Sequence, residues 1–406
     1  MRNISWLVVV FLLSTAVPSQ AELRLFPRVS FEEQYTDNLY LDTTRESDWI
    51  TGVSPGLNFS YRESWVTSSL DYSLDFLYYA NHSDENQTSL SDTQRILANA
   101  TLFPSSPFKL MLADEMGRVA VNTRQVDTLE DNVNNKATRN RFEAIPELTL
   151  NFGPTWTTVV AGGYERVDFQ NHTGDNTQRY QARLGVTKKM SPRLSLLGDA
   201  IATWLDSTDN DDYFRHEYLF GFDYQWSRAI TLRAKAGPSW TEFDTRGSVF
   251  GVSKEVAVTY QLEPLSGLIS YSSTLENEAD EGAYTQDRFR AEAGYGRRLS
   301  MVAGVTWTRN DFQEVDRRDK TIGGDLTLRW KLSSTMDWSN GLTYDRLTFD
   351  PEGEKIHRYG LSSELSMALL QTLKLGLSYT HRRDDSSDDA NDYFNNIMLV
   401  RVTWQR

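Results

Sequence analysis

The feature of this sequence that most limits its fold is a two-residue alternation of apolar and polar side chains along almost the whole chain. Between residues 66 and 78 the even positions are mostly apolar, among them Leu70, Tyr72 and Leu74, whereas the odd positions from Thr67 to Asp75 are polar. Successive side chains of a β-strand point to opposite faces, so each such segment has one apolar and one polar face. Similar segments begin at residues 218, 230, 289 and 322. The chain is therefore predicted to be all-β.

The length of these segments indicates what the apolar face touches. They last about ten to sixteen residues, whereas strands of globular proteins cluster near ~5–6 residues and a tilted strand that crosses a bilayer needs ~9–11. Short turns such as PSSP (104–107) alternate with longer polar loops such as DSTDNDD (206–212). This pattern predicts a transmembrane antiparallel up-and-down outer-membrane β-barrel of about 20 strands, with 16 or 18 as alternatives.

Aromatic residues support a lipid-facing surface. Aromatic rings prefer the headgroup level of a membrane, and barrels carry girdles of them at both interfaces. The last strand alternates in the same way, and its Trp404 resembles the C-terminal aromatic signal that barrel-assembly machinery reads, although Gln405 and Arg406 follow it. Four tryptophans within three residues of a short turn are the predicted membrane girdle: Trp65, Trp156, Trp226 and Trp330.

The first 21 residues differ from the rest of the chain. Arg2 precedes an apolar run from Ile4 to Leu13, and a small residue stands at Ala21, which predicts a cleaved secretory signal peptide over 1–21. Residues 22–406 are predicted to form a single barrel domain in the Gram-negative cell outer membrane. A net charge of −14 argues against a nucleic-acid partner. The absence of cysteine removes thiolate chemistry, and no cofactor or metal is expected.

Four prolines fall inside predicted strands and should disturb their hydrogen bonding. A proline inside a strand removes one hydrogen bond from the ladder, because its nitrogen carries no hydrogen. Pro27, Pro55, Pro146 and Pro238 fall inside predicted strands. Bulges or strand ends are expected beside these four residues.

The polar faces of the predicted strands supply the candidate functional residues. Charges of both signs on these faces are explained by water-facing groups that neutralise one another across strands. A sharper alternative is a conduit for a hydrophilic or anionic polymer, in which arginines bind carboxylates or sulfates. The predicted pore-lining residues are Asp71, Asp75, Arg183, Arg233, Lys235, Arg288, Arg290, Glu292, Arg329, Lys331 and Arg401.

Two kinds of loop invite further hypotheses. The longest connection, residues 119–138, is the third long loop and could fold inward to narrow the pore, or lie exposed at the surface. Deletion of 122–136 would then raise single-channel conductance. The acidic loops 206–212 and 384–392 could hold a divalent cation, although neither has EF-hand spacing and solvated loops are the default.

Catalysis finds no support in the sequence, which lacks HExxH, GxSxG and phosphate-binding glycine motifs. His216 and Glu217 are adjacent but would face opposite sides of a strand. We therefore expect a protein that is not an enzyme. The scattered histidines are His82, His172, His216, His357 and His381.

Three stretches resemble a known family: YTDNLYLD (35–42), WITGVSPGLNFSY (49–61) and DNVNNKATRNRFEAIPELTLNFG (131–153). An Asp-Asn near the first loop, a Pro-Gly strand and an Asn-rich loop that enters a P-x-L strand follow one another. This order resembles the PEP-CTERM system-associated outer membrane proteins. The resemblance implies a β-barrel encoded with exosortase and exopolysaccharide loci, which takes part in assembling, exporting or anchoring surface polysaccharide. It brings no catalytic residues.

The sequence is therefore consistent with two functions. The first is a barrel accessory to exopolysaccharide or surface-protein assembly or export, with exopolysaccharide or its export proteins as partners. The second is a general diffusion porin or solute channel. Both share outer-membrane lipid, lipopolysaccharide and the barrel-assembly machinery as partners. Because the alternation begins at Leu23, an N-terminal plug of ~150 residues is not expected.

Overall fold

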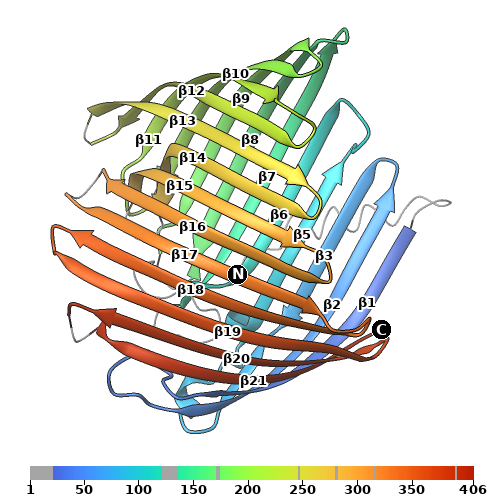
Figure 1. Cartoon of the computed structure of the whole chain (residues 1–406), viewed down its shortest axis with the longest axis vertical. Coiled ribbons are helices and arrows are strands. Elements are labelled where there is room, and N and C mark those ends of the chain that lie inside the picture. The colour runs from blue at the N-terminus through green and yellow to red at the C-terminus, as the bar shows by residue number, and fades with distance from the viewer. Residues whose placement is uncertain are drawn as a thin grey trace.

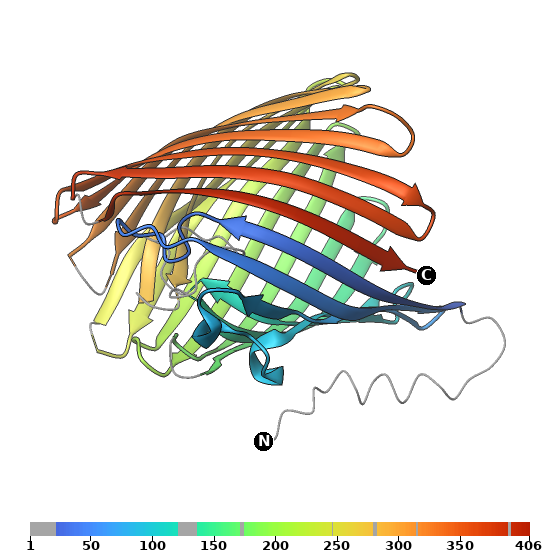
Figure 2. The ribbon, with the colours of Figure 1, turned by 90° about the horizontal axis from the view of Figure 1, so that it is seen from below.

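In the computed structural model, residues 22–120, 136–170, 174–245, 247–278, 282–313, 316–388 and 391–406 are described. They form one antiparallel sheet that curves round to meet itself (Figures 1 and 2). Two short helical turns, η2 (Ser83–Glu85) and α2 (Leu90–Thr93), lie in one connection. The strands are β1 (Glu22–Thr36), β2 (Asp48–Glu63), β3 (Val66–Leu74), β4 (Phe76–Tyr79), β5 (Gln94–Leu102), β6 (Phe108–Ala120), β7 (Lys136–Phe152), β8 (Trp156–Phe169), β9 (Thr177–Ser191), β10 (Leu194–Ser207), β11 (Tyr213–Gln225), β12 (Ile230–Phe243), β13 (Gly247–Leu262), β14 (Leu265–Glu278), β15 (Gly282–Gly296), β16 (Leu299–Phe312), β17 (Arg318–Lys331), β18 (Met336–Asp350), β19 (Glu354–Leu370), β20 (Leu373–Ser386) and β21 (Tyr393–Gln405).

The pairing of the first strand with the last closes the barrel. β1 and β21 pair antiparallel from Arg28↔Gln405 to Thr36↔Ile397. β3 and β4 both pair with β2 in one continuous register and form a single wall strand, interrupted at Asp75. There the Asp75 N–H donates to the carbonyl of Thr93 at 2.8 Å. The 21 segments therefore make 20 wall strands, which confirms the predicted number.

Of the bulges or strand ends expected beside the four strand prolines, no bulge occurs, because the register is the same on both sides of each proline; the prolines lie at gaps or ends of the ladders instead. Pairs are missing at Pro146 in the β7–β8 ladder and at Pro238 in the β11–β12 ladder, with the same register on both sides. Pro55 lies beside the break between β3 and β4. Pro27 lies one residue beyond the end of the β1–β21 ladder. Register shifts occur instead at Leu194/Ser195 and Ala368/Leu370.

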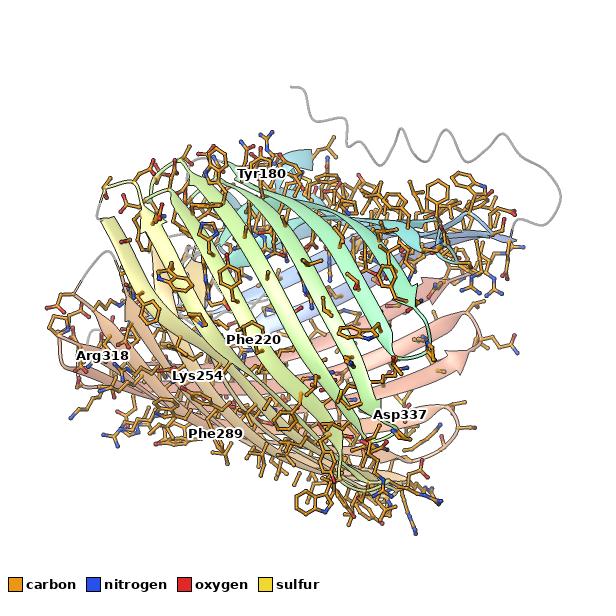
Figure 3. All side chains as sticks on the ribbon, turned by 90° about the horizontal axis from the view of Figure 1, so that it is seen from above. Tyr180, Phe220, Lys254, Phe289, Arg318 and Asp337 are labelled. Atoms are coloured by element: carbon orange, nitrogen blue, oxygen red, sulfur yellow. The ribbon has the colours of Figure 1, made fainter. Side chains whose placement is uncertain are left out.

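Ion pairs between next-but-one strands identify the inner face of the barrel, because only a concave surface brings such side chains together. Arg28 of β1 bonds Asp71 of β3 at 2.6 Å, and Lys235 of β12 bonds Asp199 of β10 at 2.9 Å. The alternate set of residues carries most of the large exposed apolar side chains, such as Phe220 with 68% of its surface exposed. Figure 3 shows Phe220 on the outer surface. The barrel therefore has a charged interior and a largely apolar exterior.

The size of the barrel leaves a wide lumen. At a strand spacing of ~4.8 Å and a tilt of ~40°, the 20 wall strands give a backbone diameter of ~40 Å, too wide for side chains to fill. The described ranges form wall strands and the connections between them.

Among the described residues, no helix has both the length and the apolar character needed to cross a membrane.

Candidate functional site

One buried charge of the inner wall is Asp199 on β10, 7% exposed. It accepts from Arg183 of β9 at 2.7 Å and from Lys235 of β12 at 2.9 Å, so one carboxylate joins two predicted pore-lining cations. Sequence reasoning missed Asp199, which stands in the apolar stretch LSLLGDAIATW. Its odd position, shared with Ser195 and Thr203, was the available signal.

Most other predicted pore-lining residues on the inner wall also have opposite charges beside them. Arg290 bonds Glu292 at 2.9 Å and Asp325 at 3.3 Å. Asp71, Arg233 and Arg401 bond Arg28, Asp223 and Glu32, respectively. Asp75 lies at the break between β3 and β4. Within the described part of the chain, four predicted residues on inner-face positions make no ion pair: Asp75, Arg288, Arg329 and Lys331.

At the end of the barrel opposite the chain termini, two neighbouring wall strands, β13 and β14, are not hydrogen-bonded to each other. The β13–β14 ladder stops at Lys254↔Ser273. Beyond it, Gly247–Ser253 pairs with β12 and Thr274–Glu278 pairs with β15, but these two segments do not pair with each other. The backbone groups along this seam need other partners.

Arg215 of β11 bridges the seam from inside. Its Nη1 donates to the carbonyl of Leu275 on β14 at 3.2 Å, and its Nη2 donates to Ser253 Oγ on β13 at 2.9 Å. Nη2 also pairs with Glu217 at 2.6 Å. The guanidinium thus replaces part of the missing ladder.

An apolar cluster closes the same region. Leu205, Tyr213 and Phe243 are on inner positions of β10 to β12, and they pack with Ala283 of β15 and with Leu275. By strand alternation Leu275 and Ala283 belong to the outer set of β14 and β15. The end of the β14–β15 hairpin therefore tucks behind the inner face of β10–β12 and narrows the lumen there.

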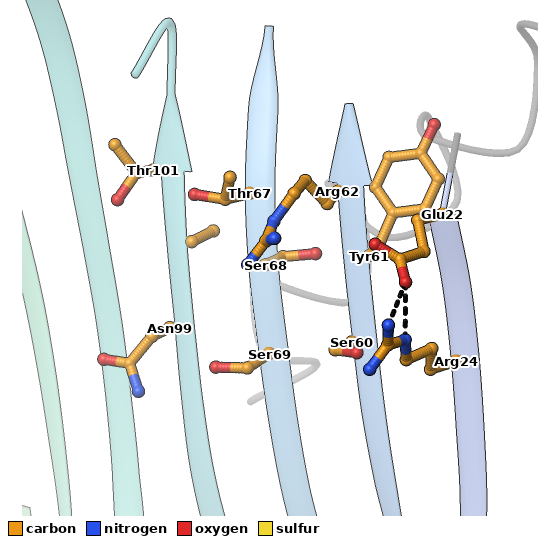
Figure 4. Close-up of a pocket in the computed structure, with 11 residues that line it drawn as sticks. Glu22, Arg24, Ser60, Tyr61, Arg62, Thr67, Ser68, Ser69, Asn99 and Thr101 are labelled. Carbon is orange, nitrogen blue, oxygen red and sulfur yellow. Dashed lines mark hydrogen bonds and ion pairs between the residues drawn. The ribbon is translucent and has the colours of Figure 1, made fainter. Parts of the chain in front are cut away.

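A polar cavity of about 320 Å³ lies at the opposite end of the barrel, on β1, β2, β3 and β5 (Figure 4). Its lining includes two rows of directly paired residues on the inner face. One row is Arg24, Ser60, Ser69 and Asn99, and the other is Glu22, Arg62, Thr67 and Thr101.

The outer surface of β8 changes from apolar to polar along the strand. On β8 the outer positions run from Trp156 to Tyr164, which spans ~26 Å along the strand and ~20 Å of height at a tilt of ~40°, close to the band of a membrane barrel. Tyr164 packs on Tyr180 at 5.2 Å and Tyr180 on Trp204 at 6.2 Å between ring centroids. This second aromatic row is one that the sequence reading missed.

Above this row the outer residues are polar. Arg166 and Asp168, the next outer residues of β8, form a bidentate ion pair of 2.8 and 2.9 Å. The predicted girdle tryptophans all lie at the other end of the barrel, beside the short turns: Trp65, Trp156, Trp226 and Trp330. Trp404 lies on the outer face of the closing strand, opposite Leu373 and Val29.

The first two long loops are joined by a histidine. His82 Nδ1 lies 2.8 Å from the buried carboxylate of Asp48, and Nε2 lies 2.8 Å from Glu46. These hydrogen bonds to Asp48 and Glu46 raise the pKa of the His82 imidazole above its usual value. Asp48 also accepts the backbone N–H groups of Asn81 and His82 at 2.9 and 3.0 Å.

The long loop 119–138 and the acidic loops 206–212 and 384–392 are the other loops for which the sequence suggested a function. Residues 121–135 lie outside the described residues, and the ends of the predicted loop 119–138 belong to β6 and β7 instead. In the loop after β10, Asp212 accepts the backbone N–H of Ser207 at 2.8 Å. No group of three or more metal-ligating side chains occurs among the described residues. His216 and Glu217 occupy alternate positions of β11, as expected.

No protein-family model matches the sequence, and no curated protein is similar to it. Solved structures are similar in fold. The ferric enterobactin receptor PfeA from Pseudomonas aeruginosa has a TM-score of 0.54 at 11% identity, over 96% of this chain and 81% of PfeA. The FrpB iron transporter from Neisseria meningitidis has a TM-score of 0.55 at 8% identity, over 94% of this chain and 81% of FrpB. This similarity concerns the fold alone, which is a closed antiparallel barrel of the outer-membrane type.

Proposed function

We propose that the protein is an up-and-down barrel of the outer membrane whose lumen forms a hydrophilic conduit. The observation that carries this proposal is the separation of the two faces. Ion-paired charges line a wide interior, and the exterior has an apolar band bounded by aromatic residues at both ends. An aqueous lumen and a lipid-facing wall explain both faces, because a polar interior and an apolar band are the surfaces of a transmembrane barrel.

For the cargo, we propose a hydrophilic polymer of an exopolysaccharide or surface-protein system of the PEP-CTERM type. The resemblance of residues 35–42, 49–61 and 131–153 to that family supports this assignment. The charged interior suits a hydroxyl-rich or acidic chain, since arginine bonds carboxylates in a bidentate manner. The alternative is a general porin or solute channel, which the same lumen would also serve. Outer-membrane lipid and the barrel-assembly machinery would be partners in either case, and residues 1–21 would direct secretion.

Two measurements test this proposal together. The purified barrel is reconstituted in planar bilayers, and a deletion strain is assayed for surface polysaccharide. A conducting barrel together with reduced polysaccharide output supports the polymer role, whereas conductance with normal output supports the porin. A polypeptide that stays dissolved without detergent, or that separates from the outer envelope on fractionation, would overturn the membrane assignment itself.

A further inference from the structure

We propose that the polar cavity on β1, β2, β3 and β5 is a binding site for an acidic saccharide, which it holds through hydroxyl groups and one carboxylate. This inference rests on the proposed function and deepens it by naming a ligand class and its position. The cavity measures about 320 Å³, a volume suited to one or two sugar rings rather than to a whole polymer.

The strand register builds the site. Arg24, Ser60, Ser69 and Asn99 are consecutive cross-strand partners, so their side chains stand side by side on the inner face. Directly opposite residues of paired strands have Cβ atoms ~4.5–5.5 Å apart, which is close to the spacing of successive sugar rings. Figure 4 shows this row across the four strands.

Small side chains make the hollow. Ser60 and Ser69 lie between the longer side chains of Arg24 and Asn99 in one row, and Thr67 lies beside Arg62 in the other. Short residues between long ones leave a depression, and each short residue here ends in a hydroxyl group. Each hydroxyl can both donate and accept a hydrogen bond, which matches the groups of a sugar ring.

The charges in the site differ in their availability. The Arg24 Nε is engaged by Glu22 at 2.6 Å. Arg62 makes no hydrogen bond or ion pair with any described residue, and Figure 4 shows it extending toward Thr67 and Ser68. Ser60, Thr67, Ser69 and Asn99 likewise make no side-chain hydrogen bond within the described chain.

One free guanidinium among uncharged donors and acceptors fits a ligand with a single carboxylate and several hydroxyls. A carboxylate can take two parallel hydrogen bonds from Arg62. Glu22 pairs with Arg62 in the register and adds a negative charge beside it, which disfavours a multiply charged phosphate. A uronic acid unit within a polysaccharide has the required groups.

The location gives the site a role. It lies at the end of the barrel where β1 begins, where β21 ends and where the β2–β3 turn is short. In an outer-membrane barrel the short turns face the periplasm. An exported acidic chain would meet this site as it enters the lumen.

The test uses the full barrel in planar bilayers, with tetragalacturonate as probe and maltotetraose as its neutral counterpart. Tetragalacturonate is expected to block the current at a concentration at least about tenfold below that of maltotetraose, because only the acidic probe can form a charge-assisted pair with Arg62. Arg62→Gln should raise the half-blocking concentration of tetragalacturonate about tenfold, because it removes that pair. Asn99→Ala should raise it severalfold.

The control is Lys109→Gln, which removes an inner-face cation of β6 that lies outside the cavity and outside the predicted pore-lining set. Its half-blocking concentration should equal that of the wild type. Equal block by the acidic and the neutral probe, or an equal loss in R62Q and K109Q, would overturn the proposal. The heat-dependent shift in gel migration confirms that each variant is folded.

A second measurement separates this inference from the proposed function. Tetragalacturonate binding to the detergent-solubilised barrel is measured by calorimetry, which requires no conduction. Binding that R62Q weakens, in a barrel that does not conduct, keeps the site and refutes the conduit. Conduction without binding refutes the site and keeps the conduit.

Discussion

Arg215 is predicted to hold the β14–β15 hairpin in its tucked position. Its two hydrogen bonds, 3.2 Å to the Leu275 carbonyl and 2.9 Å to Ser253, connect strands that the ladder leaves apart. Hydrogen bonds to charged groups contribute ~1.5–3 kcal/mol each. Water replaces these hydrogen bonds when the hairpin moves, so only part of their free energy is lost. Arg215→Met should therefore shift the equilibrium toward the untucked form by ~2–4 kcal/mol, which changes the equilibrium constant by about 30- to 1,000-fold.

Cysteine labelling can report this equilibrium because the natural chain contains no cysteine. Ala283, 1% exposed, lies in the apolar cluster that the tucked hairpin buries. In an A283C background, the rate of reaction with a water-soluble maleimide follows the untucked fraction when exchange is fast. Arg215→Met should raise that rate by about 30- to 1,000-fold. Both barrels carry A283C, so the effect of the added sulfur atom cancels.

Two controls decide the interpretation. Glu217→Gln removes the ion pair with Arg215 but keeps both seam hydrogen bonds, so the rate should change little. The Ala257→Cys substitution introduces a thiol where β13 is paired on both sides, and this thiol should label at the same rate with and without Arg215. An unchanged labelling rate at position 283 in Arg215→Met would refute the proposal that Arg215 holds the β14–β15 hairpin in place. A parallel rise at position 257 would indicate instead that the whole barrel wall is less stable.

Three other perturbations follow from the structure. Asp199→Asn leaves Arg183 and Lys235 without their shared carboxylate and should move the reversal potential in a salt gradient toward anion selectivity. Asp223→Asn changes a more exposed and more strongly screened ion pair, so it should move the reversal potential less. An unchanged or more cation-selective potential in Asp199→Asn would contradict the placement of Asp199 in the lumen. The His82 pKa is raised, so its contribution is fully present below the unfolded pKa of ~6.5 and lost as pH rises through the higher folded value. Hydrogen exchange in residues 37–47 and 80–93 should thus be slower at about pH 5.5 than at about pH 8.5 after correction for intrinsic rates, and His82→Gln should abolish the difference. Trp404→Ala should slow assembly severalfold in a membrane-insertion assay relative to Trp338→Ala, since Trp404 lies on the closing strand; equal rates would exclude a signal role.

The sequence predicted the strands and their faces because alternation is a local property of an extended chain. Asp71, Lys235 and Arg401 were assigned inner positions from their neighbours alone, and the register places them there. The number of wall strands followed from counting alternating segments. Of the bulges or strand ends expected at the prolines, ladder ends occur near Pro27 and Pro55, but no bulge occurs. A missing N–H leaves a gap in a ladder without changing which residues are opposite one another.

The tertiary structure alone decided which inner residues meet. Asp199 meets Lys235 of β12, 36 positions away, and Arg215 reaches a carbonyl of β14, 60 positions away. These contacts join strands that are not paired with each other, and they depend on the curvature of the closed wall, which brings such strands together on its concave side. The seam exists because the β13–β14 ladder ends early. The cavity exists because the register places short side chains of β2 and β3 in the same rows. Alternation along one strand therefore determines the face of each residue, and only the closure of the barrel determines its partners.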